Sequence, residues 1–201
     1  MNRRLLIILG PILAGNTDAA DAALVLRNEV TWNGNGHRYQ VASETSGISW
    51  HDARDLAVSL GGCLVSIHND AENEFVKSLI RGDASLWSAG GYRGCWLGGY
   101  QVAGAGEPGG GWTWASGEPW TYSAWGAGEP NNAAGYEHVL EIMDFAGGFG
   151  LSSNVAWNDM NAMGGNWGPM KTFIIEFAAV PSPGGANLLI GGTLFVRRRR
   201  C

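Results

Sequence analysis

Two short motifs contain side chains that could together bind a metal ion. The first is Glu129-Pro130-Asn131, with Glu137 eight positions after Glu129, and the second is Trp157-Asn158-Asp159. Three carboxylates and two amides in these motifs offer oxygen atoms. Calcium is a hard cation that takes about six to eight oxygen ligands, including water. The motifs meet that demand if the loop that carries the first converges on the later strand that carries the second.

Pro130 lies between the first two of these side chains. A cis peptide bond costs little before proline and much before any other residue. A cis bond here would turn the flanking side chains toward one point, and the sequence leaves the cis and trans states open.

The segments before these motifs favour an α+β domain. A helix is expected to begin after Ser49, with Asp52 three positions later as its capping partner, and to end at Gly61-Gly62. A second helix is expected to begin at Asn69 with Glu72 three positions later. Strands are expected in two pieces within 24–41, joined by a turn at 33–36, and at 64–67, 95–100, 136–144 and 171–178.

The stretch between the strands at 95–100 and 136–144 has no helical or strand periodicity. A loop of this length in a compact domain is usually functional or disordered. Its aromatic residues argue for order, because disordered segments are poor in them. They are Trp112, Trp114, Trp120, Tyr122 and Trp125.

Together these motifs resemble the C-type lectin family. Its long loop carries Glu-Pro-Asn, its following strand carries Trp-Asn-Asp, and its hydrophobic strand is similar to Trp96-Leu97-Gly98-Gly99. The opening helix with 61–67, the Trp112-Thr113-Trp114 approach to the loop and the last strand at 173–177 also match. The resemblance covers about 36–178. It implies a C-type lectin-like fold, with two helices, small antiparallel sheets and a long structured calcium-binding loop.

The resemblance also implies a binding mechanism. Two adjacent sugar hydroxyls would coordinate one calcium ion, donate to ligand carboxylates and accept from ligand amides. Glu-Pro-Asn accompanies mannose-, glucose-, fucose- and N-acetylglucosamine-type sugars in the family, whereas Gln-Pro-Asp accompanies galactose. We interpret Tyr136 and Phe149 as packing residues rather than a platform for the sugar ring. The implied calcium and sugar ligands are Glu129, Asn131, Glu137, Asn158 and Asp159.

The sequence departs from the family at its cysteines and at its auxiliary calcium site. The two usual disulfides would need cysteines near Ala57 and Ile175, and near Val139 and 160–163, where this chain has none. Apolar packing must therefore replace them. Whether Cys63 and Cys95 pair is left open. Asn132 and His138 stand where carboxylates would help a second ion, and Glu107 does not align with a ligand position, so one calcium is expected rather than two.

Composition narrows the function classes. The formal net charge is -5, and the only dense cluster of basic residues is the four arginines at 197–200. A nucleic-acid partner is therefore not expected, because such binding needs a basic surface. The clustered carboxylates are better explained as ligands than as a catalytic pair, so no enzyme activity is expected. The alternative to a lectin is a non-enzymatic adhesion or protein-binding module of the same fold, in which calcium is structural.

Both ends of the chain are typical of processing signals. Residues 1–22 combine a basic start, an apolar stretch and a small-residue cleavage site, as in a secretory signal peptide. The domain is expected to span 23–180. Residues 181–201 resemble the bacterial PEP-CTERM sorting signal, with a tail anchor as the alternative. These features predict an exported bacterial protein of the cell envelope, cell surface or extracellular matrix, with transient membrane contact through its tail.

Overall fold

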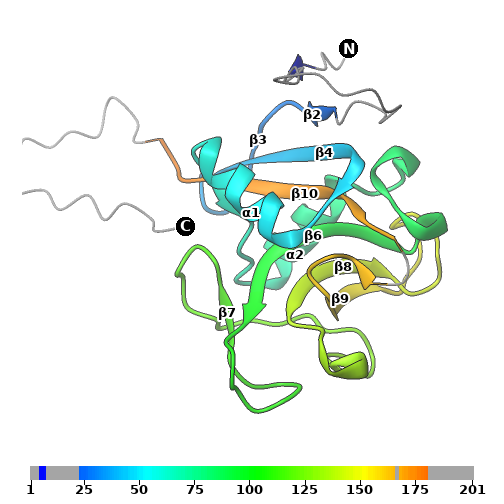
Figure 1. Ribbon diagram of the computed structural model, residues 1–201. Helices are drawn as coiled ribbons and strands as arrows, with labels where there is room; N and C mark the ends of the chain where they lie inside the picture. Colours follow the sequence, from blue (N-terminus) through cyan, green and yellow to red (C-terminus); the bar gives the residue numbers. More distant parts are fainter. Residues whose placement is uncertain (1–4, 8–22, 166–167, 181–201) are drawn as a thin grey trace, which may run out of the picture.

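The computed structural model describes residues 5–7, 23–165 and 168–180, and within them the chain forms ten strands, two α-helices and three 3₁₀ helices (Figure 1). The strands are β1 Leu5–Ile7, β2 Leu24–Leu26, β3 Val30–Thr31, β4 Arg38–Ile48, β5 Cys63–Leu64, β6 Arg93–Gln101, β7 Trp112–Trp114, β8 Val139–Asp144, β9 Val155–Met160 and β10 Met170–Phe177. The helices are α1 Trp50–Ser59, α2 Asp70–Ser78, η1 Ala84–Leu86, η2 Ala89–Gly91 and η3 Ala133–Gly135. The expected α+β composition is confirmed.

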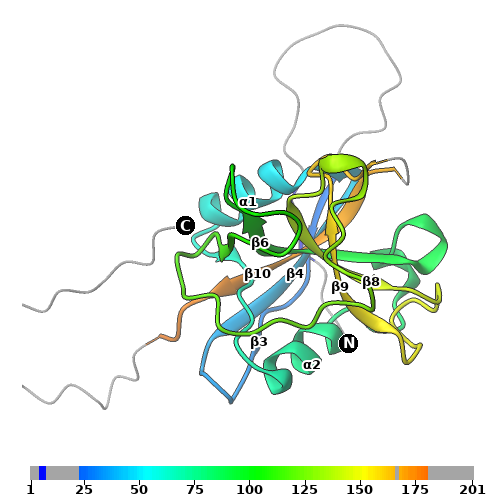
Figure 2. The same cartoon turned by 90° about the horizontal axis from the view of Figure 1, so that it is seen from below.

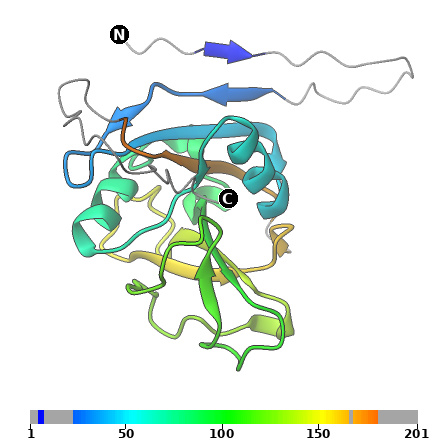
Figure 3. The same cartoon turned by 90° about the vertical axis from the view of Figure 1, so that its left-hand side faces the viewer.

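Hydrogen-bonded strands run through the molecule in the order β1-β2-β4-β10-β6-β8-β9. Most neighbours are antiparallel, but β10 and β6 are parallel, with Phe173 opposite Trp96. Figure 3 shows β1 and β2 along the outer edge, beyond β4. At the other end, β8 and β9 pair in register from Val139–Met160 to Asp144–Val155. This β8–β9 pair carries the second motif.

The two helices cover opposite faces of the strands β4 and β10 (Figure 2). Successive side chains of a strand point to opposite faces, so one strand supplies both layers of the core. Ile174 packs in the cluster that contains Val76 of α2, whereas its neighbours Phe173 and Ile175 pack with Ala53 of α1. The buried apolar run of β10 therefore joins two cores.

Both helices begin where the sequence predicts. The Ser49 hydroxyl accepts from the backbone N–H of Asp52 at 3.1 Å and donates to its carboxylate at 2.6 Å. In α2, the Asn69 side chain accepts from the N–H of Glu72 at 3.0 Å, and the Glu72 carboxylate accepts from the N–H of His68 at 2.8 Å. Each cap satisfies an amide that the helix itself leaves without a partner.

Two predicted strands are longer than the observed ones. The strand expected at 64–67 is limited to Cys63–Leu64 because the chain then leaves β10 for β6. The Val65 N–H still donates to the carbonyl of Ile174 on β10, but the Val65 carbonyl accepts from the N–H of Gly98 on β6. The strand expected at 136–144 begins only at Val139. Residues 136–138 belong instead to the approach to the candidate site.

Apolar packing occupies the positions of the two missing disulfides, as expected. Ala57 and Ile175 are both fully buried in the core beside α1. Val139 and Met160 are directly paired across β8 and β9, and both are buried. Cys95 is a free, buried thiol, so it does not pair with Cys63.

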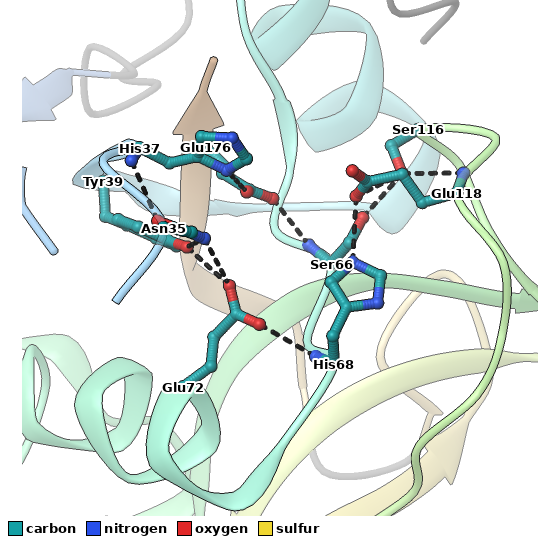
Figure 4. A network of polar contacts seen from close by, with 9 residues as sticks. All are labelled: Asn35, His37, Tyr39, Ser66, His68, Glu72, Ser116, Glu118 and Glu176. Atoms are coloured by element: carbon teal, nitrogen blue, oxygen red, sulfur yellow. Dashed lines mark hydrogen bonds and ion pairs between the residues drawn. The ribbon is translucent and has the colours of Figure 1, made fainter. Parts of the chain in front are cut away.

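A network of polar contacts fastens α2 to the strands behind it (Figure 4). The buried Glu72 carboxylate accepts from the Tyr39 hydroxyl at 2.6 Å and from the Asn35 amide at 3.0 Å. Glu176 of β10 contacts the His37 ring at 2.5 Å and accepts from the N–H of Ser66 at 3.1 Å. Burial of such groups is tolerated because they are hydrogen-bonded, and we interpret the network as structural.

The expected signals at both ends lie mainly outside the described residues. Of 1–22, the structure describes the backbone of Leu5–Ile7, which pairs with β2, and 181–201 lies wholly outside. Among the described parts of the chain, no helix has the length and apolar character needed to span a bilayer.

Candidate functional site

A cluster of aromatic rings holds the long loop in place. Trp157 of β9 is fully buried, and its ring centroid lies 5.7 Å from that of Trp114 and 5.9 Å from that of Trp125. Its indole N–H donates to the Asn73 side chain of α2 at 3.0 Å. The aromatic residues of the loop therefore form ordered packing, as the sequence predicts, and fix the residue that precedes the Asn158-Asp159 pair.

Backbone contacts then bring the first motif against the second. The N–H of Gly126 donates to the carbonyl of Trp157 at 2.8 Å. Farther along the loop, the N–H groups of Asn131 and Asn132 donate to the two carboxylate oxygens of Asp159 at 3.0 and 2.7 Å. The Glu129–Pro130 peptide bond is cis. The expected convergence of loop and strand is present, and Figure 1 shows the loop at the same end of the molecule as β8 and β9.

The converging side chains line a cavity of about 300 Å³. Glu129, Asn131, Glu137 and Asn158 belong to its wall. Asp159 is fully buried beside it and is hydrogen-bonded to Glu129. The rest of the wall is formed by Tyr92, Arg93, Ala133, Glu141, Met143, Phe145 and Met160.

The electrostatics of this cavity favour a cation. Burial raises the pKa of Glu129 to about 7, with further contributions from the hydrogen bond and charge of Asp159 and from the charge of Glu137. Burial also raises the pKa of Glu137. The Oε2 atom of Glu129 is buried without a hydrogen-bond partner. Ionised carboxylates that are partly buried next to one another are unfavourable without a counter-charge. A hard cation would reduce their repulsion and would be coordinated by the unpartnered Glu129 oxygen.

The carboxylates do not form a ready-made metal cluster. Across the described ranges, no three His, Cys, Asp or Glu side chains converge in a group that could hold an ion. The Glu137 carboxylate instead accepts from the N–H of Ala133 at 2.9 Å, and Asp159 accepts from the two loop amides. Binding of an ion by these residues would therefore require a rearrangement of their side chains.

A buried ion pair, which the motifs did not indicate, forms one wall. Arg93 of β6 donates through Nε to Glu141 of β8 at 3.0 Å, and both are buried. The other Glu141 oxygen accepts from the Asn158 amide at 3.0 Å. This contact fixes the orientation of Asn158 and leaves the oxygen of the same amide as an acceptor. The sequence signal that could have indicated this pair is a charged residue in each of two largely apolar strands, Arg93 in β6 and Glu141 in β8.

The residues considered for a second ion make contacts within the protein. The Asn132 side-chain oxygen accepts from the N–H of Glu137 at 3.0 Å. The His138 ring contacts Gln101 at 3.0 Å and lies 3.6 Å from Glu107. The expectation of one calcium rather than two stays a prediction.

The two aromatic residues interpreted as packing behave differently. Phe149 is partly buried and packs against the core beside α2. Tyr136 is 50% exposed, so that interpretation is wrong for it. The physical reason is that residues 136–138 precede β8, which begins at Val139, so they are not covered by the sheet.

Comparison with known families gives one match that covers most of the described domain. The family model described as "Lectin C-type domain" matches residues 46–163. No curated protein matches the chain.

Solved structures share the fold. The C-type lectin CEL-I from Cucumaria echinata aligns with a TM-score of 0.55 and 23% identity, covering 73% of this chain and 93% of that one. The cow CD23 carbohydrate-recognition domain, solved in the presence of a GlcNAc2Man3 oligosaccharide, aligns at 0.52 and 25%, covering 73% and 91%. A calcium-independent type II antifreeze protein aligns at 0.51 and 22%, covering 76% and 98%. The expected C-type lectin-like fold is confirmed.

Proposed function

Because this chain belongs to the family of C-type lectin domains, we propose that it binds carbohydrate through one calcium ion. The observation that carries the proposal is the meeting of both motifs at one cavity, where a buried Glu129 oxygen has no partner. Binding, and no chemical conversion, is the proposed activity. The residues that would hold the ion and the sugar are Glu129, Asn131, Glu137, Asn158 and Asp159.

The chain's own side chains would select and orient the sugar. Bound calcium would supply coordination positions for two adjacent hydroxyl oxygens. The carboxylates of Glu129 and Glu137 would accept hydrogen bonds from those hydroxyls, and the Asn131 amide would donate to them. Asn158 has one amide hydrogen committed to Glu141 and one left for a ligand. The carboxylate-then-amide order of Glu129 and Asn131 is the basis for proposing mannose-, glucose-, fucose- or N-acetylglucosamine-type sugars.

A second candidate function follows from the breadth of the fold. Antifreeze proteins share it, one of them described as calcium-independent, and fold alone does not determine function. In this alternative the domain is a non-enzymatic adhesion or protein-binding module, and calcium only stabilises the loop. The unpartnered Glu129 oxygen favours a bound cation in either case.

The proposed setting is an exported bacterial protein of the cell envelope, cell surface or extracellular matrix. The signal-like composition of 1–22 and 181–201 supports it, with the tail in transient contact with a membrane. Display of many copies on one surface would raise avidity for repeated glycans without any new contact.

The test is binding of the protein to immobilised mannose, glucose and galactose, in calcium and in a chelator. The informative variant is the double change Glu129→Gln and Asn131→Asp, which exchanges the positions of carboxylate and amide. We expect calcium-dependent binding to mannose- or glucose-type sugars, and loss of that binding or a shift toward galactose in the variant.

Three other outcomes have distinct meanings. A calcium-induced rise in melting temperature without sugar binding would favour the protein-binding alternative. Sugar binding that persists in chelator would contradict the calcium mechanism. An unchanged sugar preference in the variant would remove Glu129 and Asn131 from the binding site.

A further inference from the structure

A second and larger cavity, of about 910 Å³, lies beside the candidate calcium cavity. It is an open groove between α1, the end of β6 and the segments before β8 and after β9. This volume is near the upper end of the roughly 300–1,000 Å³ found for small-molecule sites. Its lining comprises Trp50, His51, Arg54, Asp55, Val58, Tyr100, Gln101, Ala115, Tyr136, His138, Val139 and 161–163.

One strip of chain separates the groove from the calcium cavity. Tyr136 and His138 line the groove, whereas Glu137 between them lines the calcium cavity. After β9 the pattern repeats, with Met160 in the calcium cavity and Asn161 in the groove. The two hollows are therefore opposite sides of one thin wall, and Tyr136, which is 50% exposed, lies at its rim.

The lining combines aromatic rings with hydrogen-bonding side chains. Tyr136 and Tyr100 belong to the lining, and the centroid of the Tyr100 ring lies 5.7 Å from that of Trp50. Gln101, Asn161 and His138 add amide and imidazole groups around them. Sugars present apolar C–H faces and polar hydroxyl edges, so rings flanked by amides suit them.

The charges of the groove are paired within it. Arg54 and Asp55 form an ion pair at 2.7 Å, and the guanidinium lies 5.6 Å from the Trp50 ring centroid. The carboxylate of Glu107, which lies 3.6 Å from His138, is outside the lining. The guanidinium of Arg54 and the carboxylate of Asp55 balance each other within the lining, which favours a neutral ligand over an anionic one. Figure 2 shows α1, which carries Arg54, alongside β6.

We propose that this groove binds the second and following sugars of a linear, neutral oligosaccharide whose terminal sugar occupies the calcium cavity. The inference rests on the proposed function, because the calcium cavity supplies the terminal anchor. The chain of sugars would pass over the rim at Tyr136 and continue toward Val58 on α1.

The experiment is a calorimetric titration of the whole protein with methyl mannoside and with mannose oligosaccharides of two to six units, in calcium and in chelator. Glucose oligosaccharides and a uronic-acid oligomer of equal length complete the set of probes. The groove variant is Val58→Arg, and its matched control is Val30→Arg on β3, because both valines are 42% exposed. Tyr136→Ala is a second groove variant that adds no bulk.

We expect affinity for neutral oligosaccharides to exceed that for the monosaccharide by about tenfold, from added ring contacts. Val58→Arg should remove this gain while monosaccharide affinity stays unchanged, Tyr136→Ala should also reduce the gain, and Val30→Arg should have no effect. Equal affinity for all chain lengths, or equal effects of the two arginine variants, would contradict sugar binding in the groove while leaving calcium-dependent monosaccharide binding intact. Preference for the uronic-acid oligomer would contradict the proposal that the ligand is neutral. Absence of calcium-dependent monosaccharide binding would overturn the proposed function and the inference together.

Discussion

At the scale of single residues, the ionisation of Glu129 should be linked to calcium binding. Burial, and then the contact with Asp159, raise its pKa to about 7. A metal ligand must be deprotonated, so protons compete with calcium below that pH. We expect the apparent calcium affinity to be constant above about pH 7.5 and to fall about tenfold per pH unit between 7 and 5.5, the slope for one released proton.

Calcium titrations at several pH values in chelator-treated buffer check this expectation. The matching variant is Glu129→Gln, which should bind more weakly and lose the pH dependence near 7. Constant affinity from pH 8 to pH 6 in the unmodified protein would show that Glu129 is not a ligand or is ionised throughout.

The buried pair of Arg93 and Glu141 gives a second prediction at this scale. Arg93→Met leaves a buried carboxylate without its cation, which typically costs about 3–5 kcal/mol of unfolding free energy. Replacing both residues by Met should recover most of that loss. As a control, Arg54→Met breaks the more exposed pair with Asp55 and should cost less than about 1 kcal/mol.

Urea unfolding of the four proteins measures these differences. An Arg93→Met variant as stable as the control variant would mean that Glu141 is protonated or finds another partner. The double variant should also bind calcium more weakly, because Asn158 loses its contact with Glu141.

The sequence indicated the motif residues but not this pair. Glu129, Asn131, Glu137, Asn158 and Asp159 stand in short motifs whose chemistry is local, and the structure brings them together. The pairing of Arg93 with Glu141 depends on the register between β6 and β8. Register is a long-range property, and no spacing in the sequence encodes it.

At the scale of elements, Gly98 determines how closely β6 approaches the chain after β5. A β-carbon added at Gly98 would lie 2.6 Å from the carbonyl oxygen of Leu64 and 3.0 Å from that of Val65. These are backbone atoms that cannot rotate away. Gly98→Ala should therefore destabilise the domain by about 1–3 kcal/mol, as overpacking does.

The control is Gly109→Ala, where an added β-carbon meets nothing within 4 Å. Thermal unfolding of both variants distinguishes a packing effect from a general effect of losing glycine. If the two variants have the same melting temperature, the close approach at Gly98 is not important for stability.

The helices were more predictable than the strands. Ser49 and Asn69 cap their helices through contacts three residues away, so local sequence contains the signal. The end of β5 is set by hydrogen bonds from Val65 to two distant strands, and the start of β8 by the loop before it. Such contacts are determined by the tertiary structure, which local pattern does not describe.

At the scale of the whole molecule, the domain has apolar pairs where its family carries crosslinks. Ala57 packs in the same core as Ile175, and Val139 pairs with Met160. A disulfide typically contributes about 2–4 kcal/mol to the free energy of unfolding. Without these crosslinks, a bound ion should supply a larger share of the stability of this domain. At calcium a hundred times its Kd, binding adds about 2.7 kcal/mol.

That gain should raise the melting temperature by about 5–10 °C for a domain of this size. Differential scanning calorimetry in calcium and in chelator measures the shift, with magnesium as the control cation. Identical melting temperatures in all three buffers would mean that the folded protein has no special affinity for calcium.

Calorimetric titration of calcium into chelator-treated protein measures whether both motifs together hold one calcium ion. We expect a single site of stoichiometry one, lost in Asp159→Asn, weakened in Glu129→Gln and retained in Glu107→Gln. Absence of binding, two equivalent sites, or full-strength binding by the Asp159→Asn and Glu129→Gln variants would contradict a calcium site formed by both motifs.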